Sequence, residues 1–386
     1  MADAVAPPDV RATPLWQQVA LGALIFAVGL ASALRGLFTD VRKWGVPNIY
    51  LNYSQGLVRR GLVGEVIRLL GLPESRALFA AICWAAGLLT LALLAFLAVR
   101  ATHLHPATTM LLIASQLLPT LAFNTGYLDP FICVLVILTY YFLARDWMIP
   151  AAVAAVVAPF VHEQFIFYLL PVLVLLVVRL VRRQRWLPHL VVAAAAVVGT
   201  LVIIVFDNKQ AGAALMQASP MRPEVIHAMI RDQLGQTLGS SLQFMANFYS
   251  TTWKYSLVVV VFMIAPAVLM LVFNRKLVRE APWLIAAAVG PLALLAVAWD
   301  LSRFAVMAVF ACFVVLAVAD SPLIHGAAPA EQAPAGNSVL VGALLSLGYL
   351  SLPFFYSYPQ YGYVVNTWAD WFGAFLDRPQ KWPYRP

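Results

Sequence analysis

Long, uninterrupted runs of apolar residues dominate the chain. They are rich in Leu, Ala and Val and lack the alternation of polar and apolar positions that outer-membrane barrel strands have, so they predict helices. A helix needs roughly 20 apolar residues to cross a bilayer. We predict eleven such segments, at about 16–37, 77–98, 106–123, 128–144, 147–161, 164–178, 187–206, 255–273, 281–299, 303–319 and 338–356.

The composition requires a bilayer as the solvent for most of the chain. Of the 386 residues, 62% are hydrophobic and only 11% are charged, whereas a soluble domain carries about 25% charged residues. A water-soluble globule of this length cannot hide so much apolar surface. We therefore expect one all-α integral-membrane domain, residues 1–386, that crosses a bacterial inner membrane about eleven times. The three cysteines lie inside apolar runs and are expected to be buried hydrophobes.

The basic residues orient the predicted helices, because short cytoplasmic loops carry an excess of Lys and Arg. With residues 1–15 in the cytoplasm, the basic stretches 179–185 and 275–279 both fall on the cytoplasmic side. The short outer turns at 124–128 and 161–163 contain neither Lys nor Arg. An odd number of helices then places the C-terminus in the periplasm. The net charge of +8 thus indicates topology and phosphate or lipid contacts, and we expect no nucleic-acid partner.

Longer segments connect or follow the predicted helices. One periplasmic loop covers 38–76, a second covers 207–254, a cytoplasmic linker covers 320–337, and a periplasmic tail rich in Trp and Tyr covers 357–386. Such aromatic residues usually anchor at the membrane interface, and they can also stack on sugar rings. Segment 147–178 would be about 48 Å long as one helix, which exceeds a bilayer core of about 30 Å. We therefore expect it to form a hairpin of two short helices.

Within the first periplasmic loop, segment 57–70 has the pattern of an amphipathic helix that lies in the membrane interface. Its large aliphatic residues fall near one side, and Arg59, Arg60 and Arg68 fall mostly elsewhere. Two readings of the arginines stay open. They snorkel toward lipid headgroups, or Arg59 and Arg60 clamp a lipid-linked phosphate through their planar guanidinium groups.

Polar residues near membrane depth are costly and need a reason. In the orientation above almost all of them fall at the periplasmic ends of the helices, namely Asp40, Asn124, Tyr127, Asp129, His162, Glu163, Gln164, Asp300, Ser302 and Arg303. Some have a structural alternative. Asp300 and Arg303 have the i, i+3 spacing of an ion pair, and Asp129 precedes Pro130 as a helix cap would.

His162 and Glu163 are harder to explain by structure alone. They interrupt the otherwise apolar segment 147–178, where a plain turn would use Gly, Asn or Ser. The one-sided placement of these polar residues is the strongest functional signal in the sequence.

The layout resembles the GT-C superfamily of integral-membrane glycosyltransferases, which includes arabinosyl-, mannosyl- and oligosaccharyltransferases. In that superfamily the first outer loop carries a catalytic Asp or Glu and continues through interfacial helices, and Asp40 and residues 57–70 occupy these positions here. The stretch His162-Glu163-Gln164-Phe165 is similar to the His-Lys-Glu-Glu-Arg-Phe stretch of some lumenal mannosyltransferases, without its Lys and Arg. The resemblance implies a polyprenyl-phosphate-linked sugar donor and a glycan, lipid or protein acceptor.

Glycosyl transfer from a lipid phosphate needs a carboxylate to take the acceptor's proton and cationic groups to stabilise the departing phosphate. Asp40 is the first candidate for the base, followed by Asp129 and Glu163, and His162 suits either role. The candidates for binding the substrate and its phosphate are Arg59, Arg60, Arg303, Asp300, Asn124 and Tyr127. A divalent cation, Mg²⁺ or Mn²⁺, held by Asp40, Asp129 or Glu163 is the alternative to the arginines.

Two other functions stay open at this point. A polysaccharide polymerase or ligase of the O-antigen type shares the topology and the lipid-linked substrates, but it relies on Arg and His instead of a carboxylate base. A transporter or a flippase for lipid-linked glycans needs ionisable groups near the bilayer midplane or broken helices in two matching halves. Pro159 and Pro171 flank His162, yet the polar groups cluster at one face and no internal repeat is evident.

Overall fold

The structure is a computed structural model, and it describes residues 14–36, 41, 45–221, 223, 226–227, 230, 238–296, 300–319, 336–351, 354–358 and 362–366. Within these ranges the fold is almost entirely helical, as predicted. The elements are α1 (Leu15–Leu34), α2 (Pro47–Tyr50), α3 (Leu62–Leu69), α4 (Arg76–Arg100), α5 (Pro106–Ala114), α6 (Leu117–Phe123), α7 (Asp129–Ala144), α8 (Met148–Val161), α9 (Phe165–Tyr168), α10 (Leu170–Val181), α11 (Leu187–Phe206), α12 (Lys209–Ala218), α14 (Leu238–Phe273), α15 (Arg275–Glu280), η3 (Pro282–Ile285), α16 (Ala286–Ala293), η4 (Leu294–Ala296), α17 (Leu301–Ala317), α19 (Gly336–Ser351), β1 (Phe354–Tyr358) and β2 (Gly362–Asn366). The two strands form an antiparallel hairpin in which Phe354 pairs with Asn366 and Tyr358 with Gly362.

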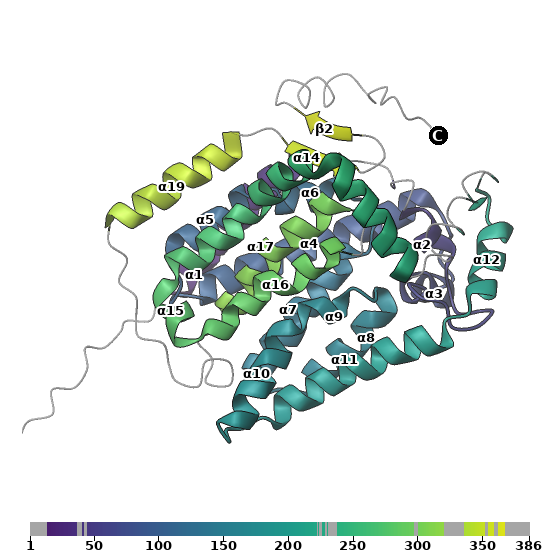
Figure 1. Ribbon diagram of the computed structural model, residues 1–386, viewed down its shortest axis with the longest axis horizontal. Coiled ribbons are helices and arrows are strands. Elements are labelled where there is room, and N and C mark those ends of the chain that lie inside the picture. The colour runs from purple at the N-terminus through teal and green to yellow at the C-terminus, as the bar shows by residue number, and fades with distance from the viewer. Residues whose placement is uncertain are drawn as a thin grey trace, which may run out of the picture.

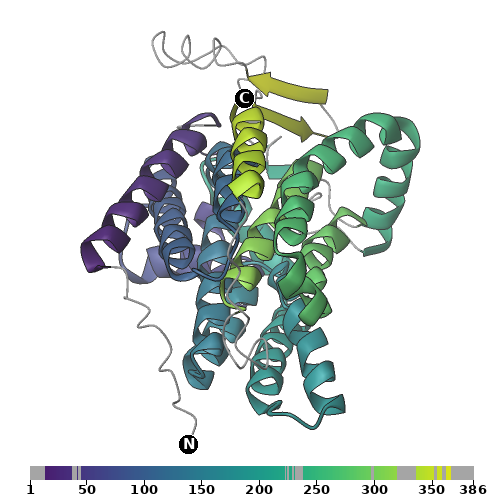
Figure 2. The same ribbon diagram turned by 90° about the vertical axis from the view of Figure 1, so that its left-hand side faces the viewer.

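Helix α17 forms the centre of the bundle. Every residue of Leu301–Ala317 is buried, and α14, α16, α6 and α4 pack against it (Figure 1). Helix α1 lies at one flank against α4, and α14 lies at the opposite flank (Figure 2). A helix that is apolar all round is stable only when other helices enclose it. The first turn of α17 therefore carries Ser302 and Arg303 into the protein interior.

In the part of the chain that the structure describes, four helical segments are long and apolar enough to cross a membrane, namely α1, α4, α5 with α6, and α11. Much of their surface is exposed, because only 17% of the apolar stretch of α1 and 33% of that of α11 is buried inside the protein. The exposed positions of α11 include Leu201, Ile204 and Phe206. Water is a poor solvent for such a surface and hydrocarbon is a good one. The fold is thus that of a helical protein suited to a membrane.

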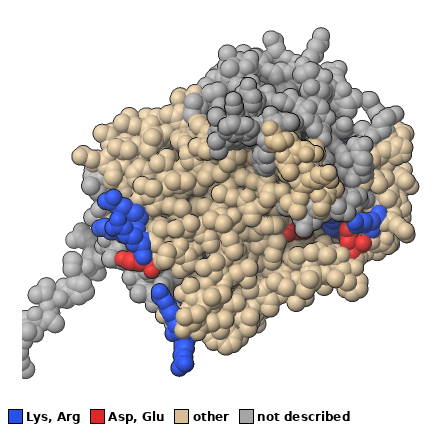
Figure 3. Space-filling model, in the orientation of Figure 1, with Lys and Arg blue, Asp and Glu red and all other residues tan. Residues whose placement is uncertain are grey.

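Charged side chains gather at two ends of the molecule, with uncharged surface between them (Figure 3). One end, which we call the basic end, comprises α15 and the turn between α10 and α11. The other, the site end, comprises the loop between α2 and α3 and the turns that follow α6 and α8. Helix α11 runs from the basic turn to Asp207. Its 20 residues span about 30 Å, which matches the hydrocarbon core of a bilayer.

Segment 147–178 forms the expected hairpin. Helix α8 ends at Val161, and His162 is extended (φ −162°, ψ 128°). At the basic end, Asp146 before α8 and Arg185 after α10 form an ion pair of 2.6 Å between Oδ2 and Nη1. The start of α8 and the end of α10 therefore lie together, and the break at His162 lies at the site end.

Several predicted helices are interrupted. Segment 106–123 is two helices, because the Ser115 hydroxyl accepts the Leu117 N–H and closes a turn between α5 and α6. Segment 281–299 consists, where described, of the short helices η3, α16 and η4, with Pro282 and Pro291 among them. Proline removes a backbone donor and disfavours a regular helix at these points. The helix predicted at 338–356 ends at Ser351, and the last three residues of the predicted segment, 354–356, belong to strand β1 instead.

Two predicted boundaries are wrong. The helix predicted at 255–273 begins already at Leu238, because its first half is too polar to be found in a search for apolar runs. The predicted loop 207–254 therefore contains α12 and the first part of α14. The interfacial helix predicted at 57–70 covers only Leu62–Leu69, since Arg60 has a positive φ angle of 63°, which an α-helix does not contain.

The structure also bears on the predictions for the cysteines, the interfacial helix and the C-terminal segments. The three cysteines are buried and unbonded, as predicted. Helix α3 turns Val63 and Ile67 into the protein and leaves Val66, Leu69 and Leu70 exposed, as an interfacial helix would. The predicted linker at 320–337 and the aromatic tail at 357–386 lie outside the described residues, apart from the start of α19 and the strand residues.

Candidate functional site

The site end brings together side chains from segments far apart in the sequence. The loop between α2 and α3 supplies Arg59 and Arg60, the turn after α6 supplies Asn124, Tyr127 and Asp129, the turn after α8 supplies His162, Glu163 and Gln164, the start of α17 supplies Asp300 and Arg303, and Asp207 follows α11. The close approach of Gly45 to Gly126 fixes one edge of this site end, because a Cβ at Gly45 would lie 2.5 Å from the Gly126 carbonyl carbon.

Asp129 and Arg303 form a buried ion pair. Arg303 Nε lies 2.5 Å from Asp129 Oδ2, and the side chains are 8% and 1% exposed. Gln164 donates from Nε2 to Asp129 Oδ1 at 2.8 Å. A buried ion pair is tolerated only when further hydrogen bonds satisfy its atoms. The pair therefore locks α7, α17 and the turn after α8 together.

Arg303 has further partners that hold its guanidinium group in place. Asp300 Oδ2 lies 3.4 Å from Nη1, so the i, i+3 ion pair predicted from the spacing is present. The guanidinium carbon lies 4.7 Å from the ring centre of Tyr127, within the range of a cation–π contact. Arg303 is thus a structural cation at the centre of the site and is not free to follow a ligand.

Arg60 and Glu163 form a second, more accessible pair. Arg60 donates from Nε to Glu163 Oε2 at 3.1 Å and from Nη2 to Oε1. The side chains are 24% and 30% exposed, so a ligand from outside can reach both. Arg60 also has a left-handed backbone (φ 63°), a strained conformation for a residue with a side chain, and such strain often marks functional sites.

The protonation state of Glu163 follows from its neighbours. Burial acts to raise the pKa of its carboxyl group, but the charge of the Arg60 guanidinium group outweighs burial and holds that pKa well below the usual range. Glu163 is therefore ionised at neutral pH. While Arg60 is bound to it, its carboxylate is a weak base.

His162 is neutral at neutral pH. Burial, and then the charge of Arg60, lower the pKa of its imidazole well below the ordinary value. Its Nδ1 accepts the Gln164 N–H at 3.3 Å, so this nitrogen carries no proton. The contact of 3.3 Å between Nδ1 and Glu163 Oε2 is consequently not an ion pair.

Arg59 is bound by a carboxylate that sequence reasoning did not place in the site. Asp207 Oδ1 accepts the Arg59 N–H at 3.0 Å, and Asp207 Oδ2 lies 3.5 Å from Arg59 Nε. Asn208 donates its N–H to the Leu57 carbonyl at 2.7 Å. These contacts attach the loop between α2 and α3 to the end of α11. Asp207 was missed because it was read as the start of the loop 207–254, although it is a polar residue at the end of an apolar helix.

Asn124 is buried, with 1% of its surface exposed. Among the described residues neither its Oδ1 nor its Nδ2 has a hydrogen-bond partner. Leaving a buried polar group without a partner costs about 1–3 kcal/mol. Such a group at the turn that also carries Tyr127 and Asp129 suits the recognition of a polar ligand.

Asp40, the first candidate for the base, lies outside the described residues. Two glycines that flank it in the sequence, Gly36 and Gly45, both pack closely on backbone of the α6 region, at Pro119 and Gly126 respectively. The prediction for Asp40 therefore stays a prediction.

Asp129 and Glu163 each face an arginine instead of each other. No three His, Cys, Asp or Glu side chains come together as a metal-binding group in the part of the chain that the structure describes. A divalent ion held by these two carboxylates would have to displace Arg303 and Arg60. The described donor set therefore fits Mg²⁺ or Mn²⁺ poorly, since these ions need several oxygen ligands that are not already paired with cations.

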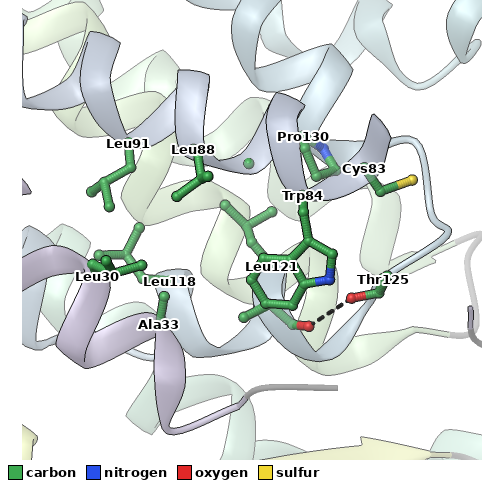
Figure 4. Close-up of a pocket in the computed structure, with 12 residues that line it drawn as sticks. Leu30, Ala33, Cys83, Trp84, Leu88, Leu91, Leu118, Leu121, Thr125 and Pro130 are labelled. Atoms are coloured by element: carbon green, nitrogen blue, oxygen red, sulfur yellow. Dashed lines mark hydrogen bonds between the residues drawn. The ribbon is translucent and has the colours of Figure 1, made fainter. Parts of the chain in front are cut away.

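An apolar pocket lies beside the site, between α1, α4 and α6 (Figure 4). It is lined mainly by aliphatic side chains from these helices, among them Leu30, Leu91 and Leu118, and Gly87 leaves part of it open. At one end it reaches Thr125 and Pro130. These are direct sequence neighbours of Asn124 and Asp129, so the pocket extends to the turn that carries the polar groups.

Comparison with known proteins adds no relative, because no family model, curated protein or solved structure matches the chain.

Proposed function

We propose that the protein is a multi-pass bacterial inner-membrane glycosyltransferase of GT-C type. In this proposal it crosses the membrane about eleven times, with the N-terminus in the cytoplasm and the C-terminus in the periplasm. It transfers a sugar from a polyprenyl-phosphate-linked donor to a glycan, lipid or protein acceptor at the periplasmic face. The observation that carries the proposal is the accessible Arg60–Glu163 pair. Gln164, the next residue after Glu163, hydrogen-bonds Asp129 of the buried Asp129–Arg303 pair.

The donor combines an anionic phosphate with a long apolar chain, and the site end has a feature suited to each. Arg59 and Arg60 offer two adjacent planar cations, which match a phosphate. The apolar pocket that ends at Thr125 and Pro130 offers hydrocarbon surface for the first isoprene units. The exposed Val66, Leu69 and Leu70 in and after α3 support a position of this loop at the membrane interface, where such a donor resides.

The transfer step assigns different roles to the two carboxylates. The acceptor hydroxyl oxygen attacks the anomeric carbon, the bond between that carbon and the phosphate oxygen breaks, and the polyprenyl phosphate leaves with the electron pair. The proton of the hydroxyl passes to a carboxylate. Glu163 suits this role because it is 30% exposed, and Asp40 stays the candidate from the first loop. Asp129 is already bound by Arg303 and Gln164, which makes it a positioning residue.

The sugar itself needs hydrogen bonds. Asn124 offers a donor and an acceptor that are buried without partners among the described residues, so a sugar hydroxyl could satisfy both. Tyr127 at the same turn is 8% exposed, and its ring is in contact with Arg303, so it positions the arginine beside the sugar site.

The test is transfer by the purified protein in lipid nanodiscs, with polyprenyl phosphates that carry radiolabelled pentoses or hexoses. Release of the label to an added acceptor measures transfer. We expect Glu163→Gln to lower kcat by about 10²–10⁴-fold, the usual contribution of a general base. Asp146→Asn, which breaks an arginine pair at the basic end, serves as the control and should keep kcat. If Glu163→Gln and Asp40→Asn both keep wild-type kcat, the reaction does not use a carboxylate base.

A specific observation also supports a second candidate, an O-antigen-type polymerase or ligase. Arg59, Arg60 and a neutral His162 lie together at the site end, and enzymes of that class rely on Arg and His. In that case His162→Asn would abolish transfer and Glu163→Gln would retain it, which is the reverse of the result expected for the glycosyltransferase.

A further inference from the structure

Both arginines of the loop between α2 and α3 are bound by carboxylates that come from other elements. Glu163, in the turn after α8, holds Arg60 through two parallel hydrogen bonds. Asp207, which follows α11, accepts the Arg59 backbone N–H with Oδ1, and its Oδ2 lies 3.5 Å from Nε of the Arg59 guanidinium group. Two adjacent cations are thus each neutralised by one anion, and three of these four side chains are at least 19% exposed.

We propose that Arg59 and Arg60 form an anion-exchange site, in which the phosphate of a lipid-linked ligand takes over their guanidinium groups from Asp207 and Glu163. This inference rests on the proposed function and adds a role for the resting ion pairs. The exchange has a consequence for chemistry. Once Arg60 turns to the phosphate, the Glu163 carboxylate is released beside the ligand and can take a proton.

The geometry favours exchange at Arg60 and not at Arg303. A guanidinium group presents a rigid fork of N–H donors that fits a carboxylate and a phosphate equally well, so the ligand can replace Glu163 without loss of hydrogen bonds. Arg60 has a left-handed backbone conformation, which is the kind of strain that clusters at functional sites. Arg303, by contrast, is enclosed by Asp129, Asp300 and Tyr127 and is 7% exposed.

The exchange also explains why the Glu163 carboxylate, the proposed base, is paired with Arg60 before the ligand binds. Glu163 bound to Arg60 has a pKa well below the usual range for a carboxyl group, which makes it a poor proton acceptor. Removal of the Arg60 charge and arrival of a phosphate both raise that pKa toward its ordinary value. The base therefore becomes competent only when the phosphate is in place.

The experiment measures binding of radiolabelled farnesyl phosphate to the full-length protein in detergent, with farnesol and inorganic phosphate as the other ligands. Because Glu163 competes with the ligand for Arg60, we expect Glu163→Gln to raise the affinity for farnesyl phosphate roughly five- to tenfold, which corresponds to about 1–1.4 kcal/mol. Asp207→Asn should raise it in the same direction through Arg59. Arg60→Gln should lower it, and Asp146→Asn, the matched pair at the basic end, should leave it unchanged.

The outcomes separate the alternatives. An unchanged or weaker affinity in both Glu163→Gln and Asp207→Asn, with farnesol binding intact as proof of folding, overturns the exchange and leaves the carboxylates as structural partners. Inorganic phosphate that binds as tightly as farnesyl phosphate overturns the lipid-linked ligand and identifies free phosphate instead. A gain in affinity without any sugar transfer by the wild type supports the exchange and refutes the proposed function. Sugar transfer by the wild type without a gain in affinity for farnesyl phosphate in the variants supports the proposed function and refutes the exchange.

Discussion

Removal of Arg303 is expected to destabilise the protein far more than removal of its partner Asp129. In Arg303→Met, the Asp129 carboxylate, which is 1% exposed, keeps a single neutral donor, Gln164 Nε2. In Asp129→Asn, Arg303 still has Asp300 at 3.4 Å and the Tyr127 ring at 4.7 Å. An uncompensated buried charge costs about 3–5 kcal/mol. We expect Arg303→Met to lose that amount and Asp129→Asn to lose clearly less.

The assay is reversible unfolding of the purified protein in mixed micelles, with the fraction folded followed by tryptophan fluorescence. The double variant Asp129→Asn with Arg303→Met should recover most of the loss, because it leaves neither charge buried alone. Asp146→Asn is the control, since its pair with Arg185 is 41–61% exposed and such pairs contribute about 1 kcal/mol or less. A loss below about 1 kcal/mol in Arg303→Met, or a larger loss in Asp129→Asn, would refute the reasoning.

Three further predictions concern pH, the apolar pocket and the topology. The folded-state pKa of His162 lies below its ordinary value of about 6.5, so the unfolded chain binds this proton more readily than the folded protein does. We therefore expect the free energy of unfolding to fall by about 1 kcal/mol between pH 6.5 and 5.5 in the wild type. His162→Asn should lack this contribution to the fall. Gly87→Leu adds a side chain where nothing lies within 4 Å, so it should fill the pocket and raise KM for a long-chain donor. Gly348→Leu, at an equally open helix position, should leave KM unchanged. Equal KM values in the two variants would contradict the pocket's role. In a cysteine-free background, Gln55→Cys should react with a membrane-impermeant maleimide from the periplasm and Lys276→Cys should not, and the reverse labelling would invert the proposed orientation.

The helical segments could be predicted well from the sequence wherever apolar runs alone define them. Segment 187–206 coincides with α11, and the hairpin in 147–178 followed from length alone. The predicted helix boundaries are wrong where something other than hydropathy determines where a helix begins or ends. The polar first half of α14 gives no hydropathy signal, and the short pieces in 281–296 follow from prolines and packing that no periodicity reports.

The membership of the site was also largely predictable, because polar residues at helix ends have few other reasons to be there. The partners within the site were not. Sequence spacing gave Asp300 with Arg303, which lie on one helix turn. It could not give Arg60 with Glu163, which are 103 residues apart, or Arg59 with Asp207, which are 148 residues apart. Such pairings depend on how the helices pack.

The two ion pairs at the site end have different roles, because one stabilises the fold and the other is accessible to a ligand. Asp129–Arg303 is enclosed, and a charge there can neither move nor exchange at low cost. Arg60–Glu163 is partly exposed, at 24% and 30% of the side chains, and in the proposed exchange its cation passes from the carboxylate to a phosphate. The sequence motif His162-Glu163-Gln164 links them, because Gln164 binds the fixed pair and Glu163 belongs to the exchangeable one. We expect a one-residue shift of this turn to disrupt both pairs at once, because Gln164 and Glu163 are adjacent in the sequence.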